Sequence, residues 1–386
     1  MKKYFLIFGI ISNIVLIGCS KNNSDITIEV TAENLTEFQK IFITGNDDQL
    51  GNWQPDSVEL GKVEKSKWVK TFSFPRGKKL EFKITRGDWG TEALNVDGTT
   101  PPNYTLEVFN DTVINIKVGL WADQIERKTE GQITGKVEYY KKFEGVGIKP
   151  RDIIVWLPPG YETDVNKFYP VLYMHDGQNI IDPETSTFQF DWQLDENADT
   201  LIRYGYIEPI IIVGIYNTPD RDYEYDEVDR GQDYVNFIID SLKPFIDNHY
   251  RTKQDRKNTA NGGASLGGLI SFILVWEHSD IFSKAFCFSP AFKIDNYDFV
   301  DNVISFKGKK KDIEVYINNG DNELDSQLQP GVDQMLNALI DQGYKKNRDF
   351  YFFKAKNSQH GERDWSINLW RSLIFLFGTE KGRMLL

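Results

Sequence analysis

Residues 26–119 contain short runs in which apolar and polar positions alternate, the pattern of strands that bury one face. Turn-forming residues separate the runs, and no stretch shows a helical period of useful length. This spacing predicts a small all-β module, a β-sandwich. The expected strands are Ile26–Val30, Lys40–Thr44, Trp68–Phe74, Leu80–Thr85, Tyr104–Val108 and Thr112–Val118.

The pattern changes after a polar stretch at residues 120–133, which we interpret as a linker. From there on, apolar strand-like runs alternate with helical stretches, such as the one between residues 235 and 246. This alternation predicts an α/β domain over residues 134–386 with a mostly parallel central sheet. The expected strands are Ile153–Leu157, Pro170–Met174, Pro209–Val213, Asn258–Gly262, Lys284–Phe288 and Asp312–Ile317.

The N-terminus is typical of a targeting segment and is excluded from the fold. Lys2 and Lys3 precede an almost wholly apolar run that ends at Cys19, and polar residues follow. This resembles a bacterial lipoprotein signal peptide over residues 1–19, with a lipid on the Cys19 sulfur and a tether at residues 20–25. A simple membrane-anchor helix is the alternative, but the run is short for a spanning helix of ~20 residues. The expected location is the bacterial cell envelope, at the outer membrane in preference to the inner one, on its periplasmic or its outer side.

Composition narrows the classes of function. The chain of 386 residues has 45 Lys and Arg against 57 Asp and Glu, a formal net charge of −12, which argues against a nucleic-acid-binding protein. Its 2 cysteines exclude a disulfide scaffold and a zinc–thiolate cluster, and its 4 histidines disfavour a multi-histidine metal centre. We therefore expect no metal. Aromatic residues make up 14%, which suits either sugar-facing surfaces or aromatic-rich β-structure.

The sharpest local motif is Gly263-Ala264-Ser265-Leu266-Gly267, which fits G-x-S-x-G between an expected strand and an expected helix. In that context a sharp turn exposes the serine hydroxyl, so Ser265 is the candidate nucleophile. The backbone N–H of Leu266 is a candidate oxyanion donor. A second donor should follow an early central strand, at the N–H groups of Gly177 or Gln178. The alternative is a glycine-rich turn with a bystander serine.

A serine nucleophile needs a general base, and in this type of hydrolase the base follows the acid along the chain. His360, in a loop after the strand-like run Phe350–Lys354, is the candidate base. Three carboxylates crowd the earlier loop in which the acid is expected. Asp325 and Glu323 both remain candidates, with a slight preference for Asp325 because a helix is expected to begin just after it.

Several further motifs accompany these residues in order: Met174-His175-Asp176-Gly177-Gln178-Asn179, Gly214-Ile215-Tyr216-Asn217 with Arg221, Pro244-Phe245-Ile246-Asp247, Ser289-Pro290 and His360-Gly361-Glu362. Together they resemble the putative esterase family of α/β-hydrolases, which includes feruloyl and acetyl xylan esterases and enterobactin-type esterases. The resemblance runs from Gly135 to Gly378. It implies Ser265 as nucleophile, His360 as base, and no metal or organic cofactor. The acid loop departs from the family pattern, because two positions compete there.

The N-terminal module resembles starch-binding-type β-sandwiches. The resemblance rests on Gly45-Asn46, Leu50-Gly51-Asn52-Trp53, Trp68, Phe82-Lys83 and Gly87-Asp88-Trp89. It implies that Trp53 and Trp89 stack on sugar rings, whose C–H groups pack well on aromatic faces. The alternative is that both tryptophans are structural, or that the module only spaces the enzyme from the membrane.

These observations favour a serine carboxylic-ester hydrolase that removes acetyl or feruloyl groups from carbohydrate through a Ser–His–Asp/Glu triad. Its expected partners are an acylated carbohydrate or another small ester, a polysaccharide on the N-terminal module, and the membrane through Cys19, with no nucleic acid. Two alternatives stay open: an esterase for enterobactin-type siderophore trilactones, and a catalytically silent glycan-binding lipoprotein. The sequence does not determine the acyl group, the alcohol part, the membrane face or the oligomeric state.

Overall fold

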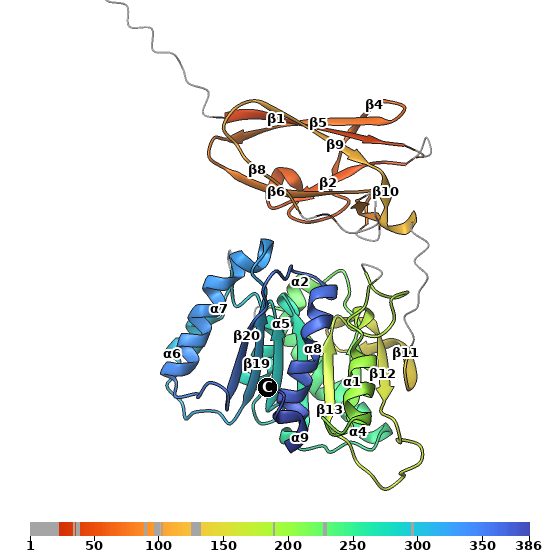
Figure 1. The fold of residues 1–386 in the computed structure, drawn as a ribbon, viewed down its shortest axis with the longest axis vertical. Helices are drawn as coiled ribbons and strands as arrows, with labels where there is room; N and C mark the ends of the chain where they lie inside the picture. The colour runs from red at the N-terminus through yellow and green to blue at the C-terminus, as the bar shows by residue number, and fades with distance from the viewer. Residues whose placement is uncertain are drawn as a thin grey trace, which may run out of the picture. The chain divides into compact units, whose positions relative to one another are not determined.

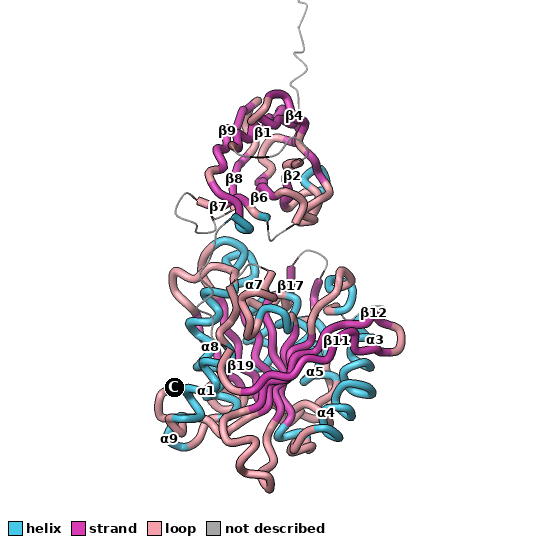
Figure 2. Tube along the Cα trace, turned by 90° about the vertical axis from the view of Figure 1, so that its right-hand side faces the viewer, coloured by secondary structure: helices cyan, strands magenta, loops and turns pink. Residues whose placement is uncertain are grey.

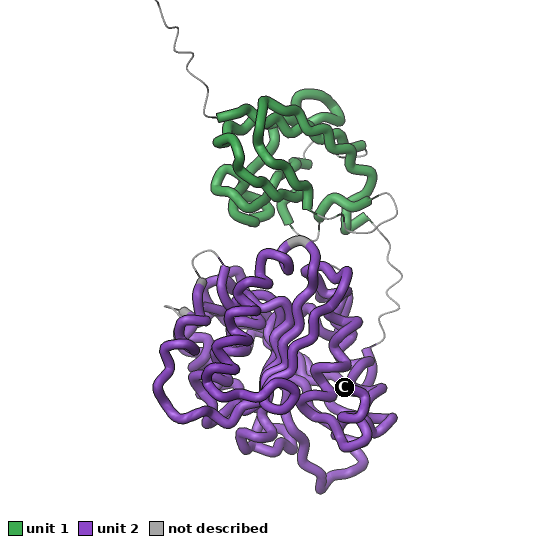
Figure 3. Tube along the Cα trace, turned by 60° about the vertical axis from the view of Figure 1, so that its left-hand side comes forward, with its two compact units in different colours: residues 1–125 green, residues 126–386 purple. Residues whose placement is uncertain are grey.

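A computed structural model of the chain describes residues 23–33, 35, 39–88, 91–95, 101, 103–124, 133–187, 190–226, 230–294 and 297–386. The chain divides into two compact units, residues 1–125 and residues 126–386 (Figure 3). Cys19 and Trp89 lie outside the described residues. Within the described ranges, no helix combines the length and the apolar character needed to cross a membrane.

The first unit is a β-sandwich, as the alternating pattern predicts. Its strands are β1 (Asn23–Ala32), β2 (Phe42–Gly45), β3 (Val58–Glu59), β4 (Gly61–Glu64), β5 (Lys67–Pro75), β6 (Lys79–Thr85), β7 (Ala93–Leu94), β8 (Tyr104–Glu107), β9 (Thr112–Val118) and β10 (Leu120–Trp121). Two four-stranded sheets, β4-β5-β1-β9 and β3-β2-β6-β8, form the sandwich (Figure 1). Ile26, Ile28 and Val30 alternate with more exposed residues along β1, so one face of the strand enters the core.

Both ends of this unit reach beyond the boundaries expected from the sequence. At the start, β1 begins at Asn23, inside the expected tether, where it pairs with Pro75 of β5. At the other end, β10 pairs with β7, and its Trp121 is 1% exposed, although the polarity of residues 120–133 predicts a linker. A two-residue strand with one buried aromatic leaves no alternating pattern, so the sequence does not reveal it.

The second unit is built on a mostly parallel sheet, which confirms the expected α/β-hydrolase class. Its main strands are β11 (Lys136–Gly145), β12 (Ile148–Leu157), β13 (Val171–His175), β14 (Ile211–Ile215), β15 (Thr259–Ala264), β16 (Lys284–Phe288), β19 (Glu314–Asn319) and β20 (Phe350–Lys354), and a hairpin pairs β17 (Lys293–Ile294) with β18 (Tyr297–Asp298). The eight main strands follow the order β11-β12-β14-β13-β15-β16-β19-β20. All pairs from β14 to β20 are parallel, and β11 and β12 are antiparallel. The edge strand β11 was not expected from the sequence, because its charged and half-exposed positions show no clear alternation of apolar and polar residues.

Helices cover both faces of this sheet (Figure 2). They are α1 (Leu194–Arg203), α2 (Arg221–Glu224), α3 (Arg230–Asn236), α4 (Lys243–His249), α5 (Leu266–Glu277), α6 (Val300–Ser305), α7 (Glu323–Asp341), α8 (Glu362–Phe377) and α9 (Glu380–Arg383), with a π-helical segment (Phe237–Leu242) joining α3 to α4. One core lies under α1 and α8, and the other under α3 to α7. Residues of β12 alternate between them: Val155 enters one core, and Ile154 and Trp156 the other. Burial on both faces explains why these strands read as continuous apolar runs.

The parallel arrangement gathers the chemistry-bearing loops at one edge of the sheet. Asp176 follows β13, Ser265 follows β15 and Ser289 follows β16. Asp325 and His360 follow β19 and β20. Because these five strands are consecutive neighbours in the sheet and run the same way, the loops after their carboxyl ends lie side by side.

A buried ion pair anchors the short helix α2 to the sheet. Arg151 on β12 donates two hydrogen bonds, of 2.7 and 3.0 Å, to the carboxylate of Glu224 in α2. The two side chains are 0% and 1% exposed. Removing one partner of such a pair leaves a buried charge without compensation. The pair therefore fixes α2, whose first residue is Arg221.

Glu224→Ala should destabilise the second unit by about 3–5 kcal/mol, because Arg151 would stay buried without its partner. The matched control is Glu162→Ala, which breaks an exposed pair with Lys136 whose side chains are 67% and 51% exposed. The control should leave the unfolding midpoint unchanged. Urea unfolding followed by tryptophan fluorescence measures both variants, and equal midpoints would show that the buried pair contributes nothing.

Candidate active site

Ser265 occupies a strained turn between β15 and α5. Its backbone angles are φ 57° and ψ −124°, a conformation that residues with a side chain rarely adopt. Gly263 is required next to it, since a Cβ there would lie 2.7 Å from the carbonyl oxygen of Gly267. The Ser265 N–H donates to the carbonyl oxygen of Phe288 at 2.9 Å, which ties the turn to the end of β16. This is the geometry that the G-x-S-x-G motif predicts.

His360 pairs with a buried carboxylate. Its Nδ1 lies 2.7 Å from Oδ1 of Asp325, and the two side chains are 15% and 1% exposed. A carboxylate can only accept, so Nδ1 carries the proton of a neutral imidazole. That tautomer leaves Nε2 free to take a proton, as a general base must.

The second oxygen of Asp325 is also fully engaged. Its Oδ2 accepts from the Ser289 hydroxyl and from the Gly320 N–H, both at 2.8 Å. The Trp365 indole N–H in turn donates to the Ser289 hydroxyl at 2.9 Å. These contacts fix the carboxylate toward His360. The sequence alone did not reveal this role of Ser289, although the position of the residue directly after a buried strand was a usable signal.

The contact favours Asp325 over Glu323 as the acid. Glu323 is the first residue of α7, and its side chain lies outside the described part of the chain. The sequence had suggested that this helix begins after Asp325, but it begins at Glu323. The Asp325 backbone N–H already donates to the carbonyl of Asn322 at 3.1 Å, so Asp325 lies inside the first turn. The role of either acid in catalysis stays a prediction.

Ser265 and His360 are connected through the segment Ser289–Ala291 and through Trp365, and no direct hydrogen bond links them among the described contacts. The Ala291 N–H donates to the Ser265 carbonyl at 3.2 Å, two residues after the Ser289 that binds Trp365. The Trp365 ring centre lies 5.0 Å from that of His360. Catalytic hydrogen bonds are often long in a free enzyme and shorten only with bound substrate.

The loop after β13 lies against the Ser265 turn. A Cβ on Gly267 would lie 3.1 Å from Oδ2 of Asp176, the residue just before Gly177. Leu266 is the first residue of α5, so its N–H has no acceptor within the helix. The N–H of Leu266 and those of Gly177 or Gln178 therefore stay the candidate oxyanion donors.

Asp176 holds that loop in place with a charged clamp. Its φ of 55° is left-handed, and its carboxylate accepts two hydrogen bonds from Arg221, at 2.7 and 2.8 Å, and one from the Asn217 amide at 2.6 Å. Burial alone would raise the pKa of Asp176, but the Arg221 guanidinium and the Asn217 amide hold it below its usual value. The sequence contained these residues only as pieces of a resemblance, without their pairing.

His175 is buried away from solvent, so it is not our candidate general base. It is 1% exposed, and its Nδ1 lies 2.8 Å from the hydroxyl of Tyr234. Burial lowers its pKa to about 4, so it is neutral at physiological pH and packs beneath the loop.

In the β-sandwich, Trp53 lies half-buried in the turn after β2. Its backbone N–H donates to the Gly45 carbonyl at 2.9 Å. The Thr85 hydroxyl donates to the Pro55 carbonyl at 2.6 Å, so this turn touches the end of β6. Trp89, beyond that strand, lies outside the described residues, and stacking of either tryptophan on sugar stays a prediction.

Asp325→Asn should lower kcat by up to ~10⁴ by analogy with serine proteases, because an amide that donates to His360 favours the wrong tautomer. Asp321→Asn is the matched control in the same loop and should be nearly silent, and Glu323→Gln should cause a small loss. Turnover of a short nitrophenyl ester, with circular dichroism to verify folding, measures all three. A large loss in Glu323→Gln beside an active Asp325→Asn would reverse the assignment.

Residues 149–376 match the family described as putative esterase, and residues 23–110 match the family described as starch binding domain. An endo-1,4-beta-xylanase/feruloyl esterase of Xylanibacter ruminicola is 31% identical over 137 residues, which are 33% of this chain and 18% of that protein. The chain spans less than two thirds of the length of the curated relatives it matches.

Solved structures share the fold. A ferulic acid esterase, 23% identical, aligns with a TM-score of 0.53 over 63% of this chain and 98% of its own. Enterochelin esterase from Shigella flexneri, 10% identical, aligns with a TM-score of 0.52 over 91% of this chain and 92% of its own. The match to the first family covers more than half of the chain, and with the fold and the site geometry it shows that this protein belongs to the putative esterase family.

Proposed function

We propose that this protein is a serine carboxylic-ester hydrolase that removes acyl groups, of the acetyl or feruloyl type, from carbohydrate. The observation that carries the proposal is the 2.7 Å contact between His360 and the buried Asp325, at the same sheet edge as the strained Ser265 turn. A nucleophile, an orienting acid and a base, which follow β15, β19 and β20 in this order at one edge of the sheet, match the needs of ester hydrolysis.

In the proposed reaction, the Ser265 hydroxyl attacks the ester carbonyl while His360 Nε2 takes its proton. Asp325 stabilises the imidazolium that forms. The N–H of Leu266 and those near Gly177 donate to the tetrahedral oxyanion, an interaction that is often the largest catalytic term. His360 then returns the proton to the leaving alcohol. A water molecule, deprotonated by His360, finally attacks the acyl–serine ester, and His360 returns this proton to the Ser265 oxygen as the carboxylic acid is released.

Three observations support carbohydrate as the alcohol part. Residues 23–110 match a starch binding domain, and one matched curated relative is described as an endo-1,4-beta-xylanase/feruloyl esterase. In the β-sandwich, a cavity of about 530 Å³ is lined by Phe42, Asp56 and Gly87 among others, beside the turn that carries Trp53. A polysaccharide held by the module would concentrate acyl groups near the esterase unit.

We also propose that the protein is lipid-anchored in the bacterial cell envelope through Cys19, at the outer membrane. The apolar run after Lys2 and Lys3 and the polar residues after Cys19 support this. The membrane would then be a partner of the chain, and its substrates would be envelope-accessible esters.

Ser265→Ala and His360→Ala should each remove nearly all hydrolysis by residues 20–386 without unfolding the protein. Triad members act as a unit, so the double variant should be little worse than either single one. The assay compares acetylated xylan, methyl ferulate, a trilactone siderophore and short nitrophenyl esters.

The substrate comparison separates the competing functions. Preferred turnover of acetylated xylan or methyl ferulate supports the proposal, and preferred turnover of the trilactone supports the siderophore alternative. If the wild-type protein cleaves none of these esters, the result supports the alternative hypothesis of a catalytically silent glycan-binding lipoprotein. A Ser265→Ala variant that keeps roughly a tenth of wild-type activity contradicts the nucleophile assignment.

Trp53→Ala combined with Trp89→Ala should abolish retention of residues 20–386 on insoluble polysaccharide, since stacking area on the sugar is lost. Turnover of soluble nitrophenyl esters should not change. Phe109→Ala is the matched control, because Phe109 is an exposed aromatic of the same unit, at 58%. Absence of wild-type binding across starch, xylan and β-glucan would favour the spacer reading.

A further inference from the structure

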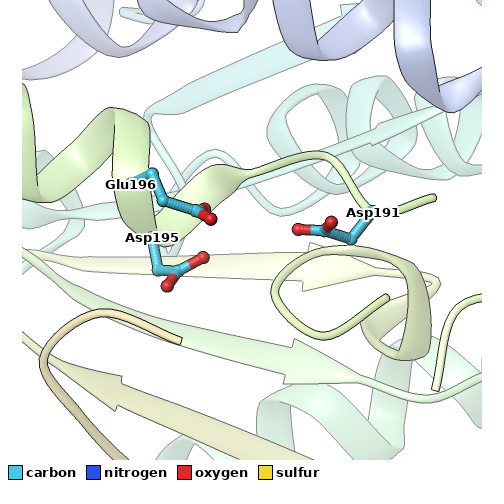
Figure 4. Close-up of side chains that lie close together, drawn as sticks. All are labelled: Asp191, Asp195 and Glu196. Atoms are coloured by element: carbon cyan, nitrogen blue, oxygen red, sulfur yellow. The ribbon is translucent and has the colours of Figure 1, made fainter. Parts of the chain in front are cut away.

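Three carboxylates converge at the start of α1, away from the proposed triad. Asp191 precedes the helix, and Asp195 and Glu196 lie in its first turn. One carboxylate oxygen of each residue lies within 4.8 Å of the other two. Asp191 is 3% exposed, Asp195 is 0% exposed and Glu196 is half-buried. Figure 4 shows the Asp191 and Glu196 carboxylates pointing toward each other, with that of Asp195 beside them.

Asp195 supplies a second observation, independent of the clustering. Although its side chain is completely buried, its Oδ1 has no hydrogen-bond partner within the residues that the structure describes. Its Oδ2, by contrast, accepts from the N–H and the hydroxyl of Thr134, at 2.6 and 3.0 Å. Oε2 of Glu196 likewise lacks a described partner. Buried polar atoms normally have a hydrogen-bond partner, so Oδ1 of Asp195 requires a ligand or a proton.

The ionisable groups that act on the cluster are acidic, and together with burial they disfavour its ionised carboxylates. Burial raises the pKa of Asp191 to about 7, and the nearby Asp195 and Asp182 add to the shift. Burial and the adjacent Asp195 raise the pKa of Glu196 to about 9. Like charges held this close are unstable unless protons or a cation neutralise them.

We propose that Asp191, Asp195 and Glu196 bind a calcium ion. A donor set made only of carboxylate oxygens suits a hard cation and not zinc or copper. The three oxygens all lie within 4.8 Å of one another, so one ion can contact all of them. Three protein carboxylates suit Ca²⁺ better than Mg²⁺, which usually keeps several waters and binds one or two carboxylates. Water would complete the shell, since Ca²⁺ takes about 6–8 oxygens.

The ion would stabilise the segment that carries Trp192. The backbone N–H of Trp192 donates to the backbone carbonyl of Asn179 at 2.9 Å. The ring centre of Trp192 lies 5.3 Å from that of Trp365. Trp365 binds the Ser289 hydroxyl, which supports Asp325. The calcium ion thus has a structural role: it supports Trp192, the first residue in a series of contacts that leads through Trp365 and Ser289 to Asp325. It contacts none of the triad candidates. The few cysteines and histidines of the sequence predicted no metal, but a site made only of carboxylates needs neither residue.

Calorimetric titration of CaCl₂ into metal-stripped residues 20–386 tests the site. We expect one Ca²⁺ per chain, with a Kd no weaker than ~10⁻³ M, the weak limit of extracellular calcium modules. Thermal unfolding should shift upward with Ca²⁺ concentration, as mass action requires. Glu196→Gln and Asp191→Asn should each weaken the affinity at least about tenfold, because each removes a ligand charge. Without Ca²⁺, Glu196→Gln should be no less stable than the wild type, which shows that it folds.

Glu184→Gln is the matched control, since Glu184 is an exposed carboxylate in the same stretch of chain, and it should bind Ca²⁺ like the wild type. No heat and no thermal shift up to ~10 mM Ca²⁺ would overturn the proposal. A proton shared by Asp195 and Glu196 would then account for the unpartnered oxygen. Undiminished binding in both variants would place the ion elsewhere and also overturn it. Tighter binding of Mg²⁺ than of Ca²⁺ would overturn the choice of ion.

Discussion

The need to satisfy one buried carboxylate organises the candidate active site. Asp325 is 1% exposed, and a buried charge without partners would cost several kcal/mol. His360 meets one of its oxygens, and Ser289 and the Gly320 N–H meet the other. These partners follow β20, β16 and β19, so a single carboxylate holds the loops after three strands in position. The orientation of the base is a consequence of this network.

The parallel sheet makes such a network possible, because it ends neighbouring strands at one edge. A second clamp of the same kind acts on the loop after β13, where Arg221 and Asn217 hold Asp176 against the Ser265 turn. Arg221 is itself placed by α2, which the buried Arg151–Glu224 pair secures. Charged contacts of long sequence separation therefore position the loops, while the apolar cores on both faces of the sheet supply its stability.

Asp325 and Asp195 are equally buried carboxylates with opposite surroundings. Donors reach both oxygens of Asp325, so it serves as a fixed anion that orients a histidine. At Asp195 the donors reach one oxygen only, and the acidic Asp191 and Glu196 lie close to this residue. The same account of hydrogen-bond partners thus supports an orienting acid at one place and the proposed calcium ligand at the other.

Apolar periodicity determined the β-sandwich and the mostly parallel sheet, and the G-x-S-x-G motif placed Ser265 at a strand-to-helix turn, because these follow from residues near one another in the chain. The order of the motifs also singled out His360. Only the tertiary structure decided which acid meets His360, gave Ser289 its role, and revealed the carboxylates around Asp195. The strand β11 was missed because half-exposed edge positions carry a weak pattern. Periodicity is a local property, whereas a side chain's partner depends on which strand ends the sheet order places together.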